Sequence, residues 1–226
     1  MKFIAKSLVA AALAGTAFVA APAVAQVNGI ATASPEAVIV RSKARIAAYQ
    51  QIDQTYAAQI TQARALRQEM ATMQQSLDAN KDGQLTEQEV GANPSVVQQI
   101  QQKEQQMAQL SQPIVLAQTY AIEQLIADYN NARQVVLQNK KIQILLNPDA
   151  IQYAPDSINV TGDIVAALDQ RMPTVQTTPP AGWRPRAESY QTQQTVQQIL
   201  LGVAQQQAAQ AAQQQQQQPP AQPSGR

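Results

Sequence analysis

The chain has 226 residues and a nearly balanced charge, with 16 lysines and arginines against 15 aspartates and glutamates. It contains no cysteine and no histidine, which excludes disulfides, thiol nucleophiles, serine–histidine triads and the usual transition-metal sites. A net charge of +1 also provides no basic surface for nucleic acid. We therefore expect a non-enzymatic protein that is held together by packing or by self-association.

The first 25 residues have the pattern of a cleavable signal peptide. Lys2 and Lys6 make a basic start, residues 8–21 form an apolar run, and Ala23-Val24-Ala25 ends in small residues. This order is typical of secretory signals, and the apolar run is too short to span a membrane. We expect cleavage after Ala25 and export from the cytoplasm; the resemblance described below implies that the destination is the periplasm.

A short strand and a long helix are predicted next. Residues 27–33 are largely apolar and rich in Val, Ile and Thr, and Ser34-Pro35-Glu36 has the pattern of a helix start that continues to about Leu77. The apolar residues that follow are spaced by three and four, broken only where Gln59 occupies a seam position: Tyr49, Ile52, Tyr56, Ala63, Leu66, Met70, Met73 and Leu77. This spacing predicts a coiled-coil seam of about four heptads, and so a helix too long for a compact single-core domain.

A second long helix completes a hairpin over residues 34–139. The chain is expected to turn at residues 78–83, and Asn93-Pro94 then marks the start of a helix that continues to about Asn139. Pro113 lies inside this helix, where it removes a backbone donor and clashes with the preceding turn. We therefore expect Pro113 to kink the helix there or to separate it into two stacked pieces.

A small base is predicted from residues 26–33 together with residues 140–172. After the apolar run 142–146 and the turn at Asn147-Pro148-Asp149, we expect a second strand at 150–153. Thr161 is expected to cap a short helix with Ile164 and Leu168 on its apolar side. Because these pieces are too small to bury a core in one copy, they are expected to assemble with other copies, and a charge at Leu145 is expected to break that assembly.

The remaining residues, 173–226, are rich in proline, threonine and glutamine and end in a glutamine tract. One amphipathic helix is possible around residues 190–203. The rest of this tail is expected to be disordered, because it has too few apolar residues to bury.

The predicted hairpin tip, residues 78–89, fits the calcium-binding loop of an EF-hand. Side-chain oxygens would come from Asp78, Asn80, Asp82 and Glu89, the carbonyl oxygen from Gln84, and an indirect or direct ligand from Thr86. Gly83 stands where the loop turns sharply. The alternative interpretation is ordinary turn chemistry, which favours Asp, Asn and Gly but does not require Glu89 at the twelfth position. The pattern therefore predicts a calcium site.

Two segments after the hairpin resemble the Skp/OmpH family of periplasmic chaperones. They are residues 144–154, Ile-Leu-Leu-Asn-Pro-Asp-Ala-Ile-Gln-Tyr-Ala, and residues 157–168, Ser-Ile-Asn-Val-Thr-Gly-Asp-Ile-Val-Ala-Ala-Leu. An apolar strand, a turn, an aromatic residue and an Asn-x-Thr sequence before the last helix make up that family's C-terminal pattern. The resemblance covers roughly residues 27–170.

The resemblance implies a mostly α, α+β fold: a long antiparallel helical hairpin on a small β-strand base that forms a trimeric barrel. It also implies a homotrimer that holds unfolded outer-membrane proteins without nucleotide, with transient contact to the membrane surface. Two features depart from the family pattern, the near-neutral charge and the extension beyond residue 173. The near-neutral charge makes electrostatic capture of clients a minor contribution.

Two other functions fit the same sequence. One is a calcium-responsive protein of the EF-hand type, whose hairpin changes shape when the metal binds. The other is a structural coiled-coil adaptor of an envelope assembly. A hollow trimer without a fixed partner would favour the chaperone, whereas stable co-purification with one partner would favour the adaptor.

Overall fold

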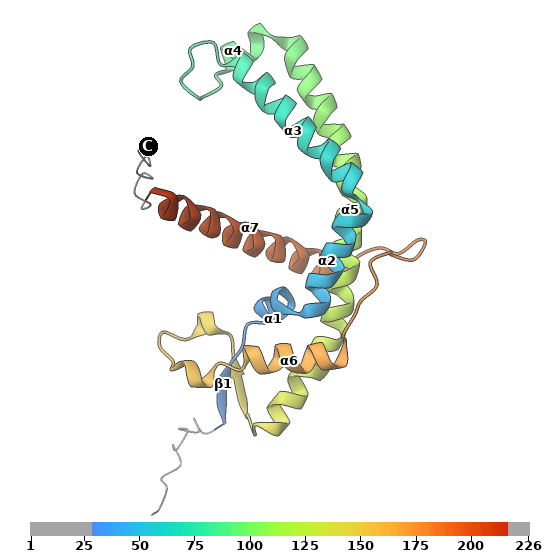
Figure 1. Cartoon of the computed structure of the whole chain (residues 1–226), viewed down its shortest axis with the longest axis vertical. Helices are drawn as coiled ribbons and strands as arrows, with labels where there is room; N and C mark the ends of the chain where they lie inside the picture. The colour runs from blue at the N-terminus through green and yellow to red at the C-terminus, as the bar shows by residue number, and fades with distance from the viewer. Residues whose placement is uncertain (1–28, 217–226) are drawn as a thin grey trace, which may run out of the picture.

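The structure is a computed structural model that describes residues 29–216 (Figure 1). The predicted signal peptide therefore lies outside the described residues. In chain order the elements are β1 (Ile30–Thr32), α1 (Pro35–Arg41), α2 (Lys43–Thr55), α3 (Ala57–Leu77), α4 (Glu87–Ala92), α5 (Pro94–Asn139), β2 (Ile144–Leu146), two 3₁₀ turns (Pro148–Ala150 and Asp156–Ile158), α6 (Thr161–Arg171) and α7 (Ala187–Gln216).

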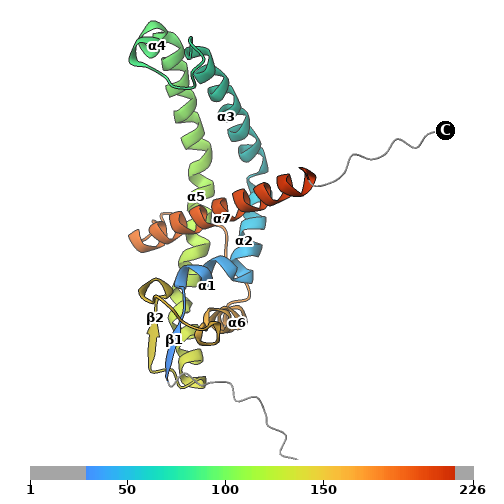
Figure 2. The same ribbon diagram turned by 90° about the vertical axis from the view of Figure 1, so that its left-hand side faces the viewer.

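The predicted mostly α fold with a long helical hairpin is confirmed. Helices α2 and α3 run antiparallel to α5, and the tip lies far from the strands (Figures 1 and 2). Helix α5 has 46 residues, which at about 1.5 Å per residue gives a length of about 70 Å. The hairpin bows, so that its tip and the strands lie on the same side of α5 (Figure 1).

The predicted heptad seam is the buried line of the hairpin. On α2 and α3, Ile52 is fully buried and Leu66, Met70 and Leu77 are 3 to 8% exposed. Opposite them, α5 buries Ile100 in its distal half. Residues between the seam positions are mostly polar and exposed, as the spacing predicted.

The single helix predicted over residues 34–77 is broken into three, which corrects that prediction. Ser42 has φ −58° and ψ 132°, so it leaves the helical region between α1 and α2. Tyr56 makes a milder break between α2 and α3, with φ −107° and ψ 23°. The first break lets α1 fold back onto α6 and α7, so α1 belongs to the base and the hairpin begins at Lys43. Burial of the apolar side chains Val38 and Ile39 on α1 compensates for the lost helical turn.

Two of the three predicted helix starts are confirmed. Ser34 is the N-cap of α1, where its hydroxyl accepts a hydrogen bond from Ala37 N at 3.1 Å, and Asn93 and Pro94 begin α5. Helix α5 continues through Pro113 as one helix. Proline at this position removes one backbone hydrogen bond, and packing along both neighbouring helices keeps the chain helical beyond it.

The base is a compact core around the lower half of α5. Its buried cluster joins β1, α1, α5, α6 and α7 and includes Ala31, Val38, Ile122, Leu125, Ile164, Leu168 and Val196. Strands β1 and β2 pair in parallel, with Ile30 opposite Ile144 and Thr32 opposite Leu146. On its other edge β1 receives a hydrogen bond from Val160 N to Thr32 O, at 2.9 Å.

Two predictions for the base are wrong in detail. Residues 150–153 are not a strand, because the chain there forms a 3₁₀ turn and then an irregular loop, while the strand lies earlier, at Ile144–Leu146. Thr161 does not cap α6, because Val160 is the N-cap residue. The Thr161 hydroxyl instead accepts a hydrogen bond from Ser34 N at 3.2 Å, so it joins the starts of α1 and α6.

The structure differs from the expected disordered tail over residues 173–216. Within residues 173–186, Gln176, Trp183 and Arg186 form hydrogen bonds with α5. The helix expected around 190–203 extends from Ala187 to Gln216 as α7. The difference arises from tertiary contacts of α7 with α1 and α5, which composition cannot reveal. Within residues 29–216, no helix has both the length and the hydrophobicity that crossing a membrane requires.

Candidate functional site

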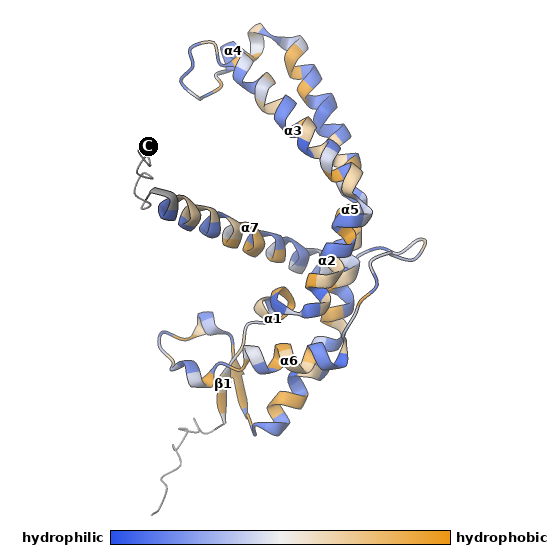
Figure 3. Ribbon diagram, in the orientation of Figure 1, coloured by the Kyte–Doolittle hydropathy of each residue, from blue (hydrophilic) through white to orange (hydrophobic). Residues whose placement is uncertain are grey.

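The exposed edge of the base is the first candidate surface. Ile30, Ile144 and Leu146 on the two strands are 37 to 49% exposed, and Tyr153 in the following loop is 86% exposed. Figure 3 shows both strands as hydrophobic, in contrast to the mixed colours of the distal hairpin. Within residues 29–216 no strand pairs with the outer edge of β2. An open strand edge beside exposed apolar side chains is the kind of surface that pairs with another chain.

Leu145 does not lie on that exposed face. Its neighbours Ile144 and Leu146 point outward, whereas Leu145 is half-buried and packs against the core of the base. The alternation follows from the two-residue repeat of a strand. A charge at Leu145 would therefore damage the protomer itself, and Ile144 is the better position for testing assembly.

The twelve residues predicted to bind calcium form the exposed tip between α3 and α4. Lys81 has φ 61° and Gly83 has φ 80°, so both residues adopt the left-handed backbone conformation, which lets the chain bend sharply. Around these turns, the Asp78 carboxylate accepts hydrogen bonds from Asp82 N at 3.2 Å and from Gly83 N at 2.8 Å. The loop thus curls around the side chain of its first residue.

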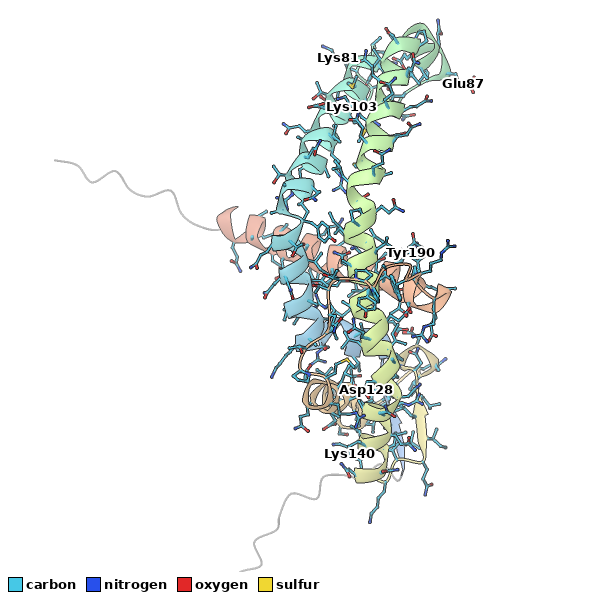
Figure 4. All side chains as sticks on the ribbon, turned by 90° about the vertical axis from the view of Figure 1, so that its right-hand side faces the viewer. Lys81, Glu87, Lys103, Asp128, Lys140 and Tyr190 are labelled. Atoms are coloured by element: carbon cyan, nitrogen blue, oxygen red, sulfur yellow. The ribbon has the colours of Figure 1, made fainter. Side chains whose placement is uncertain are left out.

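The other predicted ligands lie in the same loop. Asn80 Nδ2 donates to Asp82 Oδ2 at 2.9 Å, and Asp82 Oδ1 accepts from Gln84 N at 2.8 Å. Asp78, Asn80 and Asp82 are thus brought together with the backbone of Gln84. Lys81 and Glu87 also lie at the tip of the hairpin (Figure 4).

Glu89 closes the loop from the start of α4. It forms a capping box with Thr86, because Thr86 Oγ1 accepts from Glu89 N and the Glu89 carboxylate accepts from Thr86 N at 3.0 Å. Its other oxygen accepts from Ala79 N at 3.0 Å. The backbone N–H and the hydroxyl of Thr86 lower the pKa of Glu89 below its ordinary value. The carboxylate is therefore charged at neutral pH and turned toward the loop.

Carboxylates of the tip do not converge into a formed metal centre. Across residues 29–216, no three His, Cys, Asp or Glu side chains are grouped in a way that would hold a metal ion. The loop contains side-chain and backbone oxygens of the kind that calcium prefers as ligands. In this structure its Asp78 and Glu89 carboxylates accept hydrogen bonds from the backbone of the loop.

Ion pairs hold α6 against the lower end of α5. Asp128 accepts two hydrogen bonds from the Arg171 guanidinium, both at 2.8 Å, and Lys140 lies 3.1 Å from Asp163. Figure 4 shows Asp128 and Lys140 on this part of α5. The hydrogen bonds from Arg171 hold the pKa of Asp128 below its ordinary value. These contacts fix the base from which the hairpin projects.

One contact that the sequence did not predict joins α7 to α5. The oxygen Oε1 of Gln118 accepts hydrogen bonds from Gln193 Nε2 at 3.2 Å and from Gln197 Nε2 at 2.7 Å. The Trp183 ring stands edge-on to Tyr120, with 5.0 Å between ring centres. The spacing of Val196 and Leu200 was the available signal, but no sequence pattern identifies a glutamine on α5 as their neighbour.

Comparison with known proteins places residues 29–168 in the family model described as outer membrane protein (OmpH-like). A solved structure from Caulobacter crescentus, described as an OmpH-like outer membrane chaperone, is similar at 22% identity and a TM-score of 0.41. The match covers 71% of this chain and 92% of that one. The search of curated proteins gave no match. Because the family model spans more than half of the sequence, the chain belongs to the OmpH-like family of outer membrane proteins.

Proposed function

We propose that this protein is an ATP-independent holdase chaperone of the periplasm, which binds unfolded outer-membrane proteins and prevents their aggregation before insertion. The observation that carries the proposal is the long hairpin whose distal half has no core beyond its own seam. Such an arm provides a long surface for binding but no enclosed catalytic site, which suits a protein that holds its clients and does not convert them. Membership of the OmpH-like family supports the same role. Export through residues 1–25 and contact with a membrane surface stay predictions.

Capture by this arm would rest on many weak contacts. Glutamine is the commonest exposed residue of the distal helices, and few exposed residues there are charged, so salt screening removes only a minor part of the attraction. An unfolded β-barrel chain has unpaired strand edges, and holding it apart from other chains prevents those edges from pairing. We expect suppression of aggregation to need no nucleotide and to persist at moderate salt.

A dilution assay tests the proposal. An outer-membrane β-barrel protein unfolded in urea is diluted with and without this protein, and light scattering is followed. We expect scattering to fall without ATP. Scattering that is unchanged at a molar excess of this protein would contradict the proposal.

A shortened hairpin sharpens that test. The Lys103–Glu69 ion pair shows which residues of α3 and α5 face each other. Deleting residues 63–69 together with 103–109 therefore removes matched heptads and shortens the arm by about 10 Å while keeping the seam in phase. We expect holding of large clients to fall and holding of small ones to persist. Equal loss for both would argue against a surface on the arm.

We further propose that the protein is a homotrimer assembled through the exposed edge of β2. The exposed Ile144 and Leu146 and the open strand edge support this. Ile144→Asp should convert the assembly to monomers, measured by sedimentation velocity. Val135→Asp is the control, because Val135 is similarly exposed, at 40%, but lies on α5 and not on a strand. A wild-type chain that sediments as a monomer would overturn the proposal.

A calcium-binding tip is a second proposed property, favoured by the left-handed backbone conformation of Lys81 and Gly83, which bends the loop. Asp78, Asn80, Asp82 and Glu89 would hold the ion through side-chain oxygens, and Gln84 through its carbonyl oxygen. The ion would stiffen the tip by binding only its ordered form.

Calorimetry with calcium chloride tests the tip. Glu89→Gln should weaken binding sharply, because it removes a charged ligand yet keeps an acceptor for the capping box. Glu87→Gln is the matched control, since it removes the same charge from the same first turn of α4 without changing a predicted ligand. If wild-type protein takes up no calcium at millimolar concentration, the tip loop is a turn and not a metal site.

A further inference from the structure

Helix α7 consists of a docked half and a projecting half. In the docked half, Ser189 and Val196 are fully buried and Gln193 is 3% exposed. From Leu201 to residue 214 every side chain is exposed. Figures 1 and 2 show α7 crossing the hairpin near its middle and projecting on the side that also carries the strands and the tip. The docked half therefore covers a surface on α1 and α5.

Amide groups provide much of this docking. Gln118 is 7% exposed, and its side-chain oxygen accepts hydrogen bonds from both Gln193 and Gln197. Between these two glutamines, Val196 joins the buried cluster that contains Val38 and Ile122. The covered surface thus fits one branched apolar side chain with amide groups on either side of it.

Contacts at the start of α7 fix the position of the helix. Glu123 on α5 accepts hydrogen bonds from Trp183 Nε1 at 3.3 Å and from Arg186 N at 3.2 Å. Gln124 exchanges two hydrogen bonds with the backbone of Gln176, at 2.9 and 3.0 Å. All of these contacts lie near the surface of the protein, where water competes for them.

The surface covered by α7 extends beyond the helix. An open cavity of about 340 Å³ lies beside the start of α7, and Ile39, Ile126 and Tyr129 form its apolar lining. Glu36, Arg133 and Glu188 contribute the charged part of the lining. We call the surface formed by Gln118, Ile122, Ile39, Ile126 and Tyr129 the α7 groove. It remains partly open even when α7 is docked.

Docking of α7 is weaker than docking of its neighbour α6. Ile164 and Leu168 on α6 are completely buried, and Val160, just before α6, is nearly so. Among the side chains of α7 that the structure describes, Val196 is the only large apolar one that is completely buried. Since burial of apolar area is the main attraction between helices in water, α7 separates from the base more readily than α6.

We propose that the α7 groove binds a segment of the unfolded client, and that α7 is the internal occupant with which the client competes. The inference rests on the proposed holdase function. The chemistry of the occupant defines the partner: a polypeptide segment with a branched apolar side chain flanked by amide or hydroxyl groups. Strands of outer-membrane barrels provide such segments, because apolar and polar side chains alternate along them. The wild-type affinity for the client is then lowered by the fraction of chains in which α7 covers the groove.

Two aspartate variants of the full chain test this proposal. Val196→Asp places a charge in the buried contact and releases α7, whereas Leu201→Asp makes the same change at a position that is 59% exposed. Release is measured by hydrogen exchange in residues 187–200 and by tryptic cleavage after Arg186, with exchange in α6 as the check that the base is folded. If Val196→Asp unfolds α6, Glu123→Gln is used to loosen α7 from its start.

Two ligands are titrated by fluorescence anisotropy: a labelled peptide of residues 187–203 and a urea-unfolded outer-membrane β-barrel protein. We expect the releasing variant to bind each ligand about fivefold more tightly than the wild type or Leu201→Asp, because its groove is open. Unlabelled peptide should displace the client from the releasing variant.

The outcomes separate the two proposals. If α7 is released and the peptide binds but the client affinity does not rise, the groove recognises only α7 and this inference is wrong, while the holdase function stands. If the peptide binds all variants equally, or none, the groove is not a binding surface. If no variant and no wild-type protein binds or protects the client, the holdase proposal itself fails.

Discussion

The two halves of the hairpin are built differently although α5 runs through both. Near the base, α5 is covered on several faces, and six of its residues have no exposed surface: Ala117, Thr119, Ala121, Ile122, Leu125 and Ala132. In the distal half each helix buries only one line of residues, and even these retain 3 to 8% exposure at Leu66, Met70, Leu77 and Ile100. Only the base half has a core to which several elements contribute.

This difference predicts a gradient of stability along the molecule. A buried core residue has neighbours from several elements, whereas a seam residue of a two-helix arm has neighbours from one partner helix. Regions with few buried apolar contacts open locally at low free-energy cost. The base is thus expected to be more rigid than the arm.

The largest expected effect is in the base. Leu125→Ala should lower the free energy of unfolding by about 3 kcal/mol, because it leaves a cavity in a site closed on all sides. Urea denaturation at fixed protein concentration measures the loss. Val135→Ala is the control on the same helix, at 40% exposure, and should change stability by less than about 0.5 kcal/mol. Equal losses would show that the base has no core at Leu125.

In the arm, Leu66→Ala should cost about 2 kcal/mol, near the low end for buried leucine, because the two helices can close around the smaller side chain. Its effect should also be local. Hydrogen exchange should quicken in α3 and the distal half of α5 and remain unchanged in α6. Faster exchange throughout the base would contradict the separation of the two halves.

Low pH should destabilise the folded base of the protein, where α5 meets α6, through protonation of Asp128. Its pKa is lowered by hydrogen bonds from Arg171, so the folded state favours the charged carboxylate. This contribution is complete above the unfolded carboxyl pKa of about 3.9 and is lost as pH falls through the lower folded value. Asp128→Asn should therefore be less stable than wild type at pH 7 and differ little from it at pH 2. A difference that grows with acidity would refute the assignment.

The smallest expected effect concerns the ion pair between Lys103 and Glu69 in the arm. The Glu69 side chain is 55% exposed, and ion pairs in such positions contribute about 0.5 kcal/mol or less. Lys103→Ala should leave the denaturation midpoint almost unchanged in low salt and indistinguishable from wild type in high salt. A large loss of stability would mean that the distal arm depends on charge pairing and not on its apolar seam.

The hairpin was predictable because its information is local. The spacing from Tyr49 to Leu77, the start at Asn93-Pro94 and the loop from Asp78 to Glu89 each depend on residues close together in the chain. Propensity and periodicity act over such distances. The same holds for the candidate calcium ligands, which lie within twelve consecutive residues.

Other features depended on contacts between distant residues. The break at Ser42 arises because α1 packs on α6 and α7, more than 100 residues later in the chain. The inward position of Leu145 depends on the pairing of β2 with β1. No spacing rule reveals these neighbours, because the free energy that selects them comes from burial in the assembled base.

Helix α7 shows most clearly where prediction from the sequence ends and tertiary structure decides. Its sequence by itself determined a segment rich in glutamine and alanine with a weak apolar pattern at Val196 and Leu200, and that pattern is compatible with either a helix or a solvated tail. Tertiary structure decided between them by placing Gln118 and Glu123 of α5 against Gln193 and Arg186. A buried amide is stable only where a partner completes its hydrogen bonds, and that partner is set by the fold and not by the neighbouring sequence.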